Sequence, residues 1–176
     1  MRVQRTIDRE PQPWRNGRGV QYEIDANGPT PDGWTWKLST ADITEDVPFS
    51  VFPDVSRQFC VAEGNGVELM IDGSLHMCSK GSITPFAGDA VVHARLLDGP
   101  MKALNLMTRN SDCARLEFLE AGQSQTRVLA VVAICGACAV DIGGQSFALQ
   151  VLDAALDLNG SEVRLVTGRA AILIRD

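Results

Sequence analysis

The chain has 176 residues, of which 45% are hydrophobic and 22% charged, proportions typical of a soluble globular protein rather than a disordered one. A formal net charge of -6 argues against nucleic-acid binding, which needs a concentrated basic face. No apolar run approaches the ~20 residues that span a bilayer, and the N-terminal segment has no signal-like apolar core, so we expect a cytoplasmic protein without nucleic-acid or membrane partners.

Short runs of β-branched and apolar residues recur along the whole chain, separated by glycine turns, and no segment shows a convincing helical period. The pattern predicts an all-β chain. The expected strands are Val20–Asp25, Thr35–Ala41, Gln58–Glu63, Val67–Ile71, Leu75–Cys78, Ala90–Leu97, Lys102–Met107, Ala114–Glu120, Arg127–Ile134, Ala139–Ile142, Ser146–Leu149, Glu162–Val166 and Ala170–Ile174. Tight hairpins are expected at Asp72-Gly73, Gly143-Gly144 and Asn159-Gly160, where glycine tolerates positive φ.

Two stretches of the chain, Gly64–Gly73 and Gly136–Gly144, share a glycine turn, an alternating strand and a hairpin glycine. The similarity favours duplication of one β-unit, although the ordinary turns of a β protein could also produce it. Jelly-roll barrels cover the exposed edges that many short strands leave. We therefore predict two cupin-like barrels of the jelly-roll or double-stranded β-helix type, fused in one chain. Residues 1–110 would form the first barrel and residues 111–176 an intimately packed second half.

The five cysteines lie mostly in apolar strand-like runs, so reduced, buried thiols are expected. Cys135 and Cys138 have the CxxC spacing, but they lie between two strand-like runs and no second CxxC completes a zinc site. The usual cupin metal site takes three histidines and a glutamate, and this chain has only His76 and His93. We expect neither a metal nor another cofactor.

Several motifs in the first two-thirds of the chain carry a resemblance to a known family. They are PWRNGRGVQYEI at 13–24, Trp36–Ser39, PFSVFPDVSR at 48–57, PFAGD at 85–89 and Leu104–Met107. With these motifs in this order, the chain resembles the HutD/Ves family, bacterial two-barrel cupins found with histidine-utilisation genes. The chain departs from the family pattern at Arg18, Val20, Asp54 and Ala103-Leu104. The resemblance therefore concerns the fold more than the ligand.

The resemblance implies binding of a small histidine-breakdown metabolite, such as formylglutamate or urocanate, to limit the output of the pathway. Three functions stay open from the residues themselves. The chain could be a metal-independent protein that senses or sequesters a small anionic metabolite, or a metal-free cupin isomerase or hydrolase with Glu23 or His76 as general base. It could also be a structural or partner-binding module, and the chain could form a homodimer. We favour the binding protein, because no catalytic constellation stands out.

The segment at 13–24 contains the first candidate site residues. Gly17 and Gly19 could turn backbone N–H groups toward a carboxylate, and Asn16 adds a side-chain donor and acceptor. Glu23 could accept from an amide or an imidazole, and Trp14 offers an apolar wall. Alternatively the segment only closes the barrel, with Trp14 as a plug and Glu23 paired to an arginine.

Arg57 precedes an apolar strand, so its guanidinium could reach into a barrel mouth and capture a carboxylate with two hydrogen bonds. It could instead form an exposed ion pair with Asp54 or Glu63. Asn105 points opposite its leucine neighbours, where a buried amide needs partners. We expect the residues shortly before Arg57 to pack a loop against the barrel rather than touch ligand: Phe49, Ser50, Phe52 and Pro53.

His76 is in phase with Cys78 and opposite Leu75 and Met77. If the latter two face outward, His76 lies inside the barrel and could orient a ligand or move a proton. A lone histidine on a strand is nevertheless more often structural. Ser39 and Arg95 are weaker candidates for ligand binding.

Overall fold

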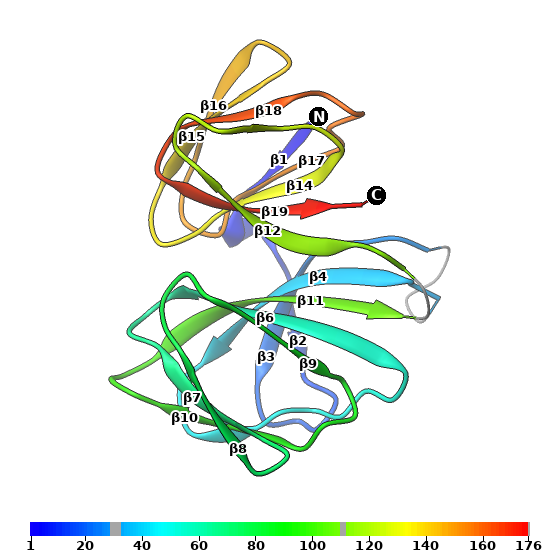
Figure 1. Cartoon of the computed structure of the whole chain (residues 1–176), viewed down its shortest axis with the longest axis vertical. Coiled ribbons are helices and arrows are strands. Elements are labelled where there is room, and N and C mark those ends of the chain that lie inside the picture. Colours follow the sequence, from blue (N-terminus) through cyan, green and yellow to red (C-terminus); the bar gives the residue numbers. More distant parts are fainter. Residues whose placement is uncertain (29–32, 110–111, 176) are drawn as a thin grey trace. The chain divides into compact units, whose positions relative to one another are not determined.

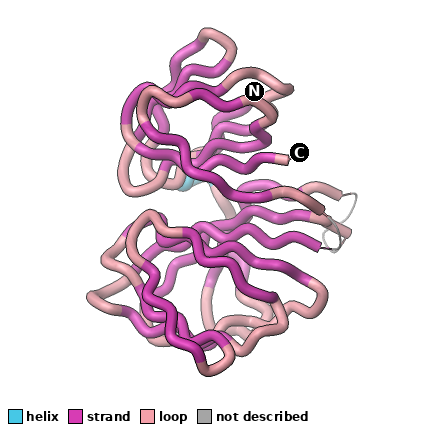
Figure 2. Tube along the Cα trace, viewed as in Figure 1, coloured by secondary structure: helices cyan, strands magenta, loops and turns pink. Residues whose placement is uncertain are grey.

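The computed structural model describes residues 1–28, 33–109 and 112–175 and consists of strands joined by turns, with one short 3-10 helix, η1 (Thr6–Asp8), among the described residues (Figure 2). The chain divides into two units. One is Glu10–Asp112, called the first barrel below, and the other is Met1–Arg9 with Cys113–Asp176, called the second barrel. Within the described ranges, no helix is long and apolar enough to cross a membrane.

The first barrel has a six-stranded and a four-stranded antiparallel sheet (Figure 1). In spatial order the larger sheet contains β2 (Pro11–Pro13), β3 (Val20–Ala26), β4 (Trp36–Ile43), β11 (Met101–Arg109), β6 (Val55–Glu63) and β9 (Ile83–Ala87). The smaller contains β5 (Val47–Pro48), β10 (Val92–Leu96), β7 (Val67–Ile71) and β8 (Ser74–Cys78).

The core of the first barrel forms where the inner faces of these two sheets meet. Alternate residues of β6, such as Phe59 and Val61, pack against Leu69 of β7 and Val92 of β10. All four are at most 3% exposed, as the period-two alternation of a half-buried strand requires.

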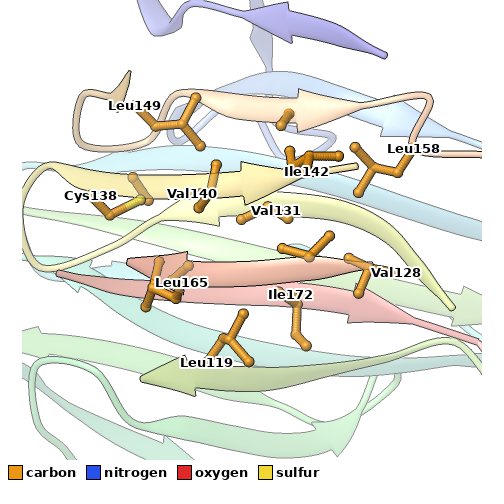
Figure 3. Close-up of a cluster of buried hydrophobic side chains, with 14 of the residues drawn as sticks. Leu119, Val128, Val131, Cys138, Val140, Ile142, Leu149, Leu158, Leu165 and Ile172 are labelled. Carbon is orange, nitrogen blue, oxygen red and sulfur yellow. The ribbon is translucent and has the colours of Figure 1, made fainter. Parts of the chain in front are cut away.

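The second barrel has a five-stranded and a four-stranded antiparallel sheet. In spatial order the larger contains β1 (Arg2–Gln4), β17 (Ala154–Leu156), β14 (Val128–Ala133), β19 (Arg169–Ile174) and β12 (Arg115–Glu120). The smaller contains β13 (Ser124–Gln125), β18 (Val163–Thr167), β15 (Cys138–Ile142) and β16 (Gln145–Leu149). Figure 3 shows the core between them, where Val131 and Ile172 of the larger sheet lie near Val140 and Leu165 of the smaller.

The two barrels repeat one strand order. The small sheets run β5-β10-β7-β8 and β13-β18-β15-β16, and the large sheets share β4-β11-β6-β9 and β12-β19-β14-β17. The matching hairpins turn at Asp72-Gly73 and Gly143-Gly144, as predicted. This correspondence supports the duplication of one β-unit.

The all-β prediction is confirmed, and each predicted strand overlaps an observed one. Six strands were not predicted: β1, β2, β5, β9, β13 and β17. Three of them, β2, β5 and β9, contain proline, which counts against a strand in a sequence but is tolerated at a sheet edge.

The division into barrels differs from the expected one at the N-terminus. Arg2 pairs with Leu156, so Met1–Arg9 groups with the second barrel rather than the first. The expected boundary, between residues 110 and 111, lies outside the described residues. Pairing between the two ends of a chain is non-local, and no pattern within either segment indicates it.

All five cysteines are free thiols, and Cys60, Cys78 and Cys138 are buried. Burial raises the pKa of the Cys138 thiol to about 11, which keeps it protonated and poorly nucleophilic at neutral pH. Cys135, with φ 64°, and Cys138 flank the turn that leads into β15.

Candidate functional site

Strand register brings polar residues together on the inner face of the first barrel. Ser39 of β4 pairs with Asn105 of β11, which pairs with Phe59 of β6. In the neighbouring row, Met107 pairs with Arg57. Directly paired residues of antiparallel strands point to the same face, so Arg57 and Asn105 share the interior with Ser39.

A cavity of about 40 Å³, counted as space open to the centre of a water molecule, lies among these side chains. That is room for roughly three waters. Polar groups of Gln21, Ser39, Arg57 and Asn105 line it, and aromatic residues form much of the remaining wall: Trp14, Phe49, Phe52 and Phe59.

Arg57 is 9% exposed, and the structure gives its guanidinium two long hydrogen bonds. Nη1 donates to the Ser50 carbonyl at 3.3 Å and Nη2 donates to Asn105 Oδ1 at 3.4 Å. Nε is buried without a hydrogen-bond partner. Among the described residues, no carboxylate lies within ion-pair distance of this cation.

Aromatic rings surround the Arg57 guanidinium in place of a carboxylate. Its central carbon lies 4.9 Å from the ring centroid of Phe86, 5.2 Å from Phe49 and 5.9 Å from Phe52. Ring faces attract a cation, which offsets part of its desolvation. Burial lowers the pKa of Arg57 to about 10, so the group stays charged at neutral pH.

Three other groups that line the cavity have unused hydrogen-bonding capacity within the described part of the chain. Neither the Ser39 hydroxyl nor the Gln21 amide makes a side-chain hydrogen bond there, and Asn105 uses only its oxygen. The Asn105 amide nitrogen is therefore a free donor beside the Arg57 guanidinium. The site offers a cation, amide donors and a hydroxyl, a set suited to a carboxylate that carries a further polar group.

The loop at 14–19 holds Trp14 against the cavity. Asn16 Nδ2 donates to the Pro48 carbonyl at 3.0 Å, and its Oδ1 accepts from the Arg18 N–H at 3.0 Å. The Gly17 N–H donates to the Trp14 carbonyl at 2.9 Å. Only Trp14 of these predicted site residues lines the cavity.

Gly19 does not form the predicted carboxylate nest, because its φ is not positive, unlike the 69° of Gly17. The Trp14 ring lies so close to Gly19 that an added Cβ would be 2.7 Å from it. Close packing on the indole, rather than an anion, explains glycine at this position.

Glu23 is paired to a lysine rather than to the arginine that the alternative interpretation supposed. Lys37 Nζ lies 2.8 Å from Glu23 Oε2, with the two side chains 12% and 41% exposed. Glu23 pairs with Ser39 in the sheet but does not line the cavity. The structure therefore does not bring Glu23 to the Arg57 cavity.

His76 lies on the inner face of β8, where it pairs with the buried Leu69, but its side chain is exposed rather than enclosed in the barrel as predicted. Leu75 and Met77 are 56% and 62% exposed, as the condition required, yet His76 is exposed as well. The reason is that β8 is an edge strand, paired only with β7, so neither of its faces is fully covered. Among the described residues, no group of three or more His, Cys, Asp or Glu could hold a metal.

Sequence reasoning did not assign Gln21, Phe49, Ser50 and Phe52 to the site, and all four line the cavity. Phe49 does pack the loop against the barrel, 5.5 Å from the ring of Phe59, and lines the cavity at the same time. Alternation along the strand is the available signal for Gln21, since it lies two residues before Glu23 and therefore on the same face of β3. Period-two counting identifies a face but not how far along it a cavity extends.

The family model for HutD matches residues 6–174. A protein named Ves from Citrobacter koseri is 38% identical over 104 residues, which cover 57% of this chain and 53% of the relative. A Pseudomonas putida protein described as lying in the hutC 3' region is 34% identical over 113 residues, covering 61% and 57%. The chain spans about half the length of the curated relatives it matches.

Solved structures match over nearly the whole chain. HutD from Pseudomonas fluorescens SBW25 superposes with a TM-score of 0.78 at 28% identity, covering 99% of this chain and 98% of that one. A cupin 2 conserved barrel domain protein from Leptotrichia buccalis gives a TM-score of 0.59 at 14% identity, covering 89% and 88%. This last likeness concerns the fold alone and confirms the cupin-like barrels predicted from the sequence.

Proposed function

The chain belongs to the HutD family, and we propose that its first barrel binds a small carboxylate-bearing metabolite beside Arg57. Binding needs no metal in this proposal. The bound metabolite would come from histidine breakdown, and its capture would sense or sequester it and so modulate histidine utilisation.

One observation carries the proposal: a buried, charged guanidinium without a carboxylate partner among the described residues. Burying a charge is costly unless an opposite charge or strong hydrogen bonds compensate it. Arg57 has two bonds of 3.3 and 3.4 Å and an unpartnered Nε. A ligand carboxylate would supply the missing charge and accept short, charge-assisted hydrogen bonds.

The other cavity groups support a ligand that carries a second polar function. Asn105 has a free amide nitrogen, and Ser39 and Gln21 offer a hydroxyl and an amide. The space suits a carboxylate head group, with the rest of the ligand against the aromatic residues Trp14 and Phe52. Formylglutamate and urocanate both combine a carboxylate with a further polar group.

The link to histidine breakdown rests on relatives. The Pseudomonas putida relative is described by its place beside hutC, and the matching solved structure from Pseudomonas fluorescens is named HutD. These names do not state a ligand, so the metabolite is part of the proposal.

The two residues that the enzyme alternative takes as general bases, Glu23 and His76, do not line this cavity. Glu23 is bound to Lys37, and His76 is exposed on the edge strand β8. A general base must lie within hydrogen-bond reach of the proton it removes. Neither residue lines the Arg57 cavity, so we retain binding as the proposed function.

Calorimetric titration of the protein with histidine, urocanate, formiminoglutamate, formylglutamate and glutamate tests the proposal. We expect one of the anionic intermediates to bind more tightly than histidine or glutamate. Absence of binding by every compound at millimolar concentration contradicts the proposal. Conversion of a bound compound to a new product supports the enzyme alternative instead.

A further inference from the structure

Edge strands carry unpaired backbone groups, and folded β proteins protect them with proline, charge or short length. The four sheets have eight edge strands among the described residues. Five of these contain proline or have only two or three residues: β1, β2, β5, β9 and β13. Strand β12 carries charged residues, and the Ala148 carbonyl of β16 accepts from Arg5 Nη1 at 3.2 Å.

The remaining edge strand in the described part of the chain is β8, at the end of the smaller sheet of the first barrel (Figure 1). Its five residues, Ser74–Cys78, include neither proline nor a residue of fixed charge. Leu75 and Met77 are more than half exposed, and Met70 beside Leu75 is 42% exposed. The strand thus combines an open backbone edge with an apolar outer face.

The hairpin turn determines which backbone groups of β8 face outward. Asp72 and Gly73 both have positive φ, 47° and 83°, as a two-residue type I′ loop requires. Such a loop closes on a hydrogen-bonded pair, here Ile71 with Ser74. Because hydrogen-bonded and non-hydrogen-bonded pairs alternate, the N–H and C=O groups of Leu75 and Met77 point away from β7.

A second copy of β8 fits this edge in one antiparallel register. With a twofold axis at His76, Leu75 of each copy lies opposite Met77 of the other. These are the residues whose backbone groups face outward, so both can hydrogen-bond across the axis. Their apolar side chains also meet on the same outer face.

Charge complementarity supports the same register. Continuing the pairing beyond the strand places Asp72 of each copy opposite Lys80 of the other, once at each end. Both residues are exposed, and one oxygen of Asp72 accepts from the Val91 N–H at 2.8 Å, which fixes the carboxylate at the turn. We propose that two copies of this chain associate by antiparallel pairing of their β8 strands about a twofold axis at His76.

Sedimentation velocity of the whole chain over a concentration series, with a proline variant, tests the proposal. A small interface predicts weak association, so we expect the dimer to form at protein concentrations of roughly 100 μM. Met77→Pro removes an outward N–H without touching the bonds to β7, and should shift the dissociation constant at least tenfold. Ala148→Pro, at the equivalent position of hairpin β15–β16, is the matched control and should leave association unchanged.

Two further measurements test the register itself. Lys80→Glu places like charges at both ends of the paired strands and should weaken association about tenfold. Adding Asp72→Asn should recover much of the loss.

His76→Cys in a Cys113→Ser background should form a disulfide between the two introduced cysteines, because non-hydrogen-bonded pairs lie close together. Peptide mapping locates the disulfide. A monomer at 500 μM, or a dimer indifferent to Met77→Pro, overturns the proposal, and so does a dimer whose cross-link maps to another cysteine.

Discussion

Asn105 accepts a hydrogen bond from Arg57 through its side-chain oxygen, Nη2 to Oδ1 at 3.4 Å, across the neighbouring strands β11 and β6. The bond leaves the Asn105 amide nitrogen free and helps to orient the guanidinium toward the cavity. Asn105 also pairs with Ser39, so a single β-ladder row carries two of the polar groups that line the cavity.

Replacing Asn105 with aspartate supplies the carboxylate that Arg57 lacks. Asn105→Asp is nearly isosteric, and the new ion pair competes with an external anion. We expect anionic ligands to bind at least about a hundredfold more weakly, since a charge-assisted contact is worth about 1.5–3 kcal/mol and a second negative charge repels the ligand. Titration and thermal unfolding of the ligand-free variant measure the effect.

Asn105→Leu is the companion variant, which removes the amide without adding charge and should weaken binding less than Asn105→Asp does. Equal losses in the two variants would mean that Arg57 is not the anchor of the anion.

Arg57→Met should separate binding from stability. Burial lowers the pKa of Arg57 to about 10, so keeping the guanidinium charged opposes folding at every pH below that value, and the penalty is relieved only as pH rises above it. Methionine removes this cost and the cation–ring attractions together. We expect the free energy of unfolding to change by less than about 1 kcal/mol, while ligand binding falls ten- to a hundredfold.

Arg169→Met is the control for that experiment. Arg169 contacts Glu120 at 2.7 Å in a partly exposed pair of the second barrel, so ligand binding should not change. The proposed placement of the site is wrong if Arg57→Met binds as the wild type does, or if Arg169→Met is equally damaging.

The sequence predicted those parts of the fold and site that depend on local pattern. Alternation and turn glycines predict the central strands. Four of the predicted site residues line one cavity: Trp14, Ser39, Arg57 and Asn105. Arg57 and Asn105 come from strands far apart in sequence. Asn105 is conspicuous between Leu104 and Leu106, and Arg57 comes shortly before the apolar run Phe59–Ala62.

The remainder depended on non-local geometry. The pairing of Arg2 with Leu156, the exposed position of His76 and the engagement of Glu23 by Lys37 each follow from which strands become neighbours or edges. Gly19 illustrates the same limit. A glycine that avoids an indole ring and a glycine that turns toward an anion look identical in a sequence.

Gly19→Ala should displace Trp14. An added Cβ would lie 2.7 Å from the indole, so the ring must move away from the cavity that it lines. We expect a loss of about 1–3 kcal/mol in stability and weaker ligand binding, measured by chemical denaturation and titration. Gly17→Ala, where a Cβ meets nothing within 4 Å but φ is 69°, should cost only about 1 kcal/mol and spare binding. Equal effects on binding would contradict the role given to the indole wall.

Glu23→Gln tests whether the Glu23 carboxylate contacts the ligand or serves only as the ion-pair partner of Lys37. The side chain lies 2.8 Å from Lys37 and does not line the cavity, so its loss removes negative charge near the site without removing a ligand contact. Anionic ligands should therefore bind as well as before or about twofold more tightly at low salt. A tenfold loss of affinity in the titration would instead return Glu23 to the ligand contacts predicted from the sequence.

Asp153→Asn should destabilise the second barrel in a pH-dependent way. Asp153 is 2% exposed, and burial raises its pKa, but hydrogen bonds from Arg5, Thr6 and Gln150 outweigh that effect and hold the pKa below its ordinary value. A depressed folded-state pKa stabilises the protein above the unfolded value of ~3.9, and this contribution is lost as pH falls through the folded value.

Urea unfolding of Asp153→Asn between pH 7 and pH 3 should show a loss of about 2–4 kcal/mol at neutral pH that shrinks below about pH 4, because an amide nitrogen in place of Oδ2 cannot accept the bonds that Arg5 and Gln150 donate. Asp157→Asn is the matched control: its carboxylate contacts Arg2 at 3.3 Å in a pair more than half exposed, and the change should cost little at any pH. A loss for Asp153→Asn that is constant from pH 7 to pH 3 would show that the charge of Asp153 contributes nothing, and that shape alone holds the N-terminal segment on the second barrel.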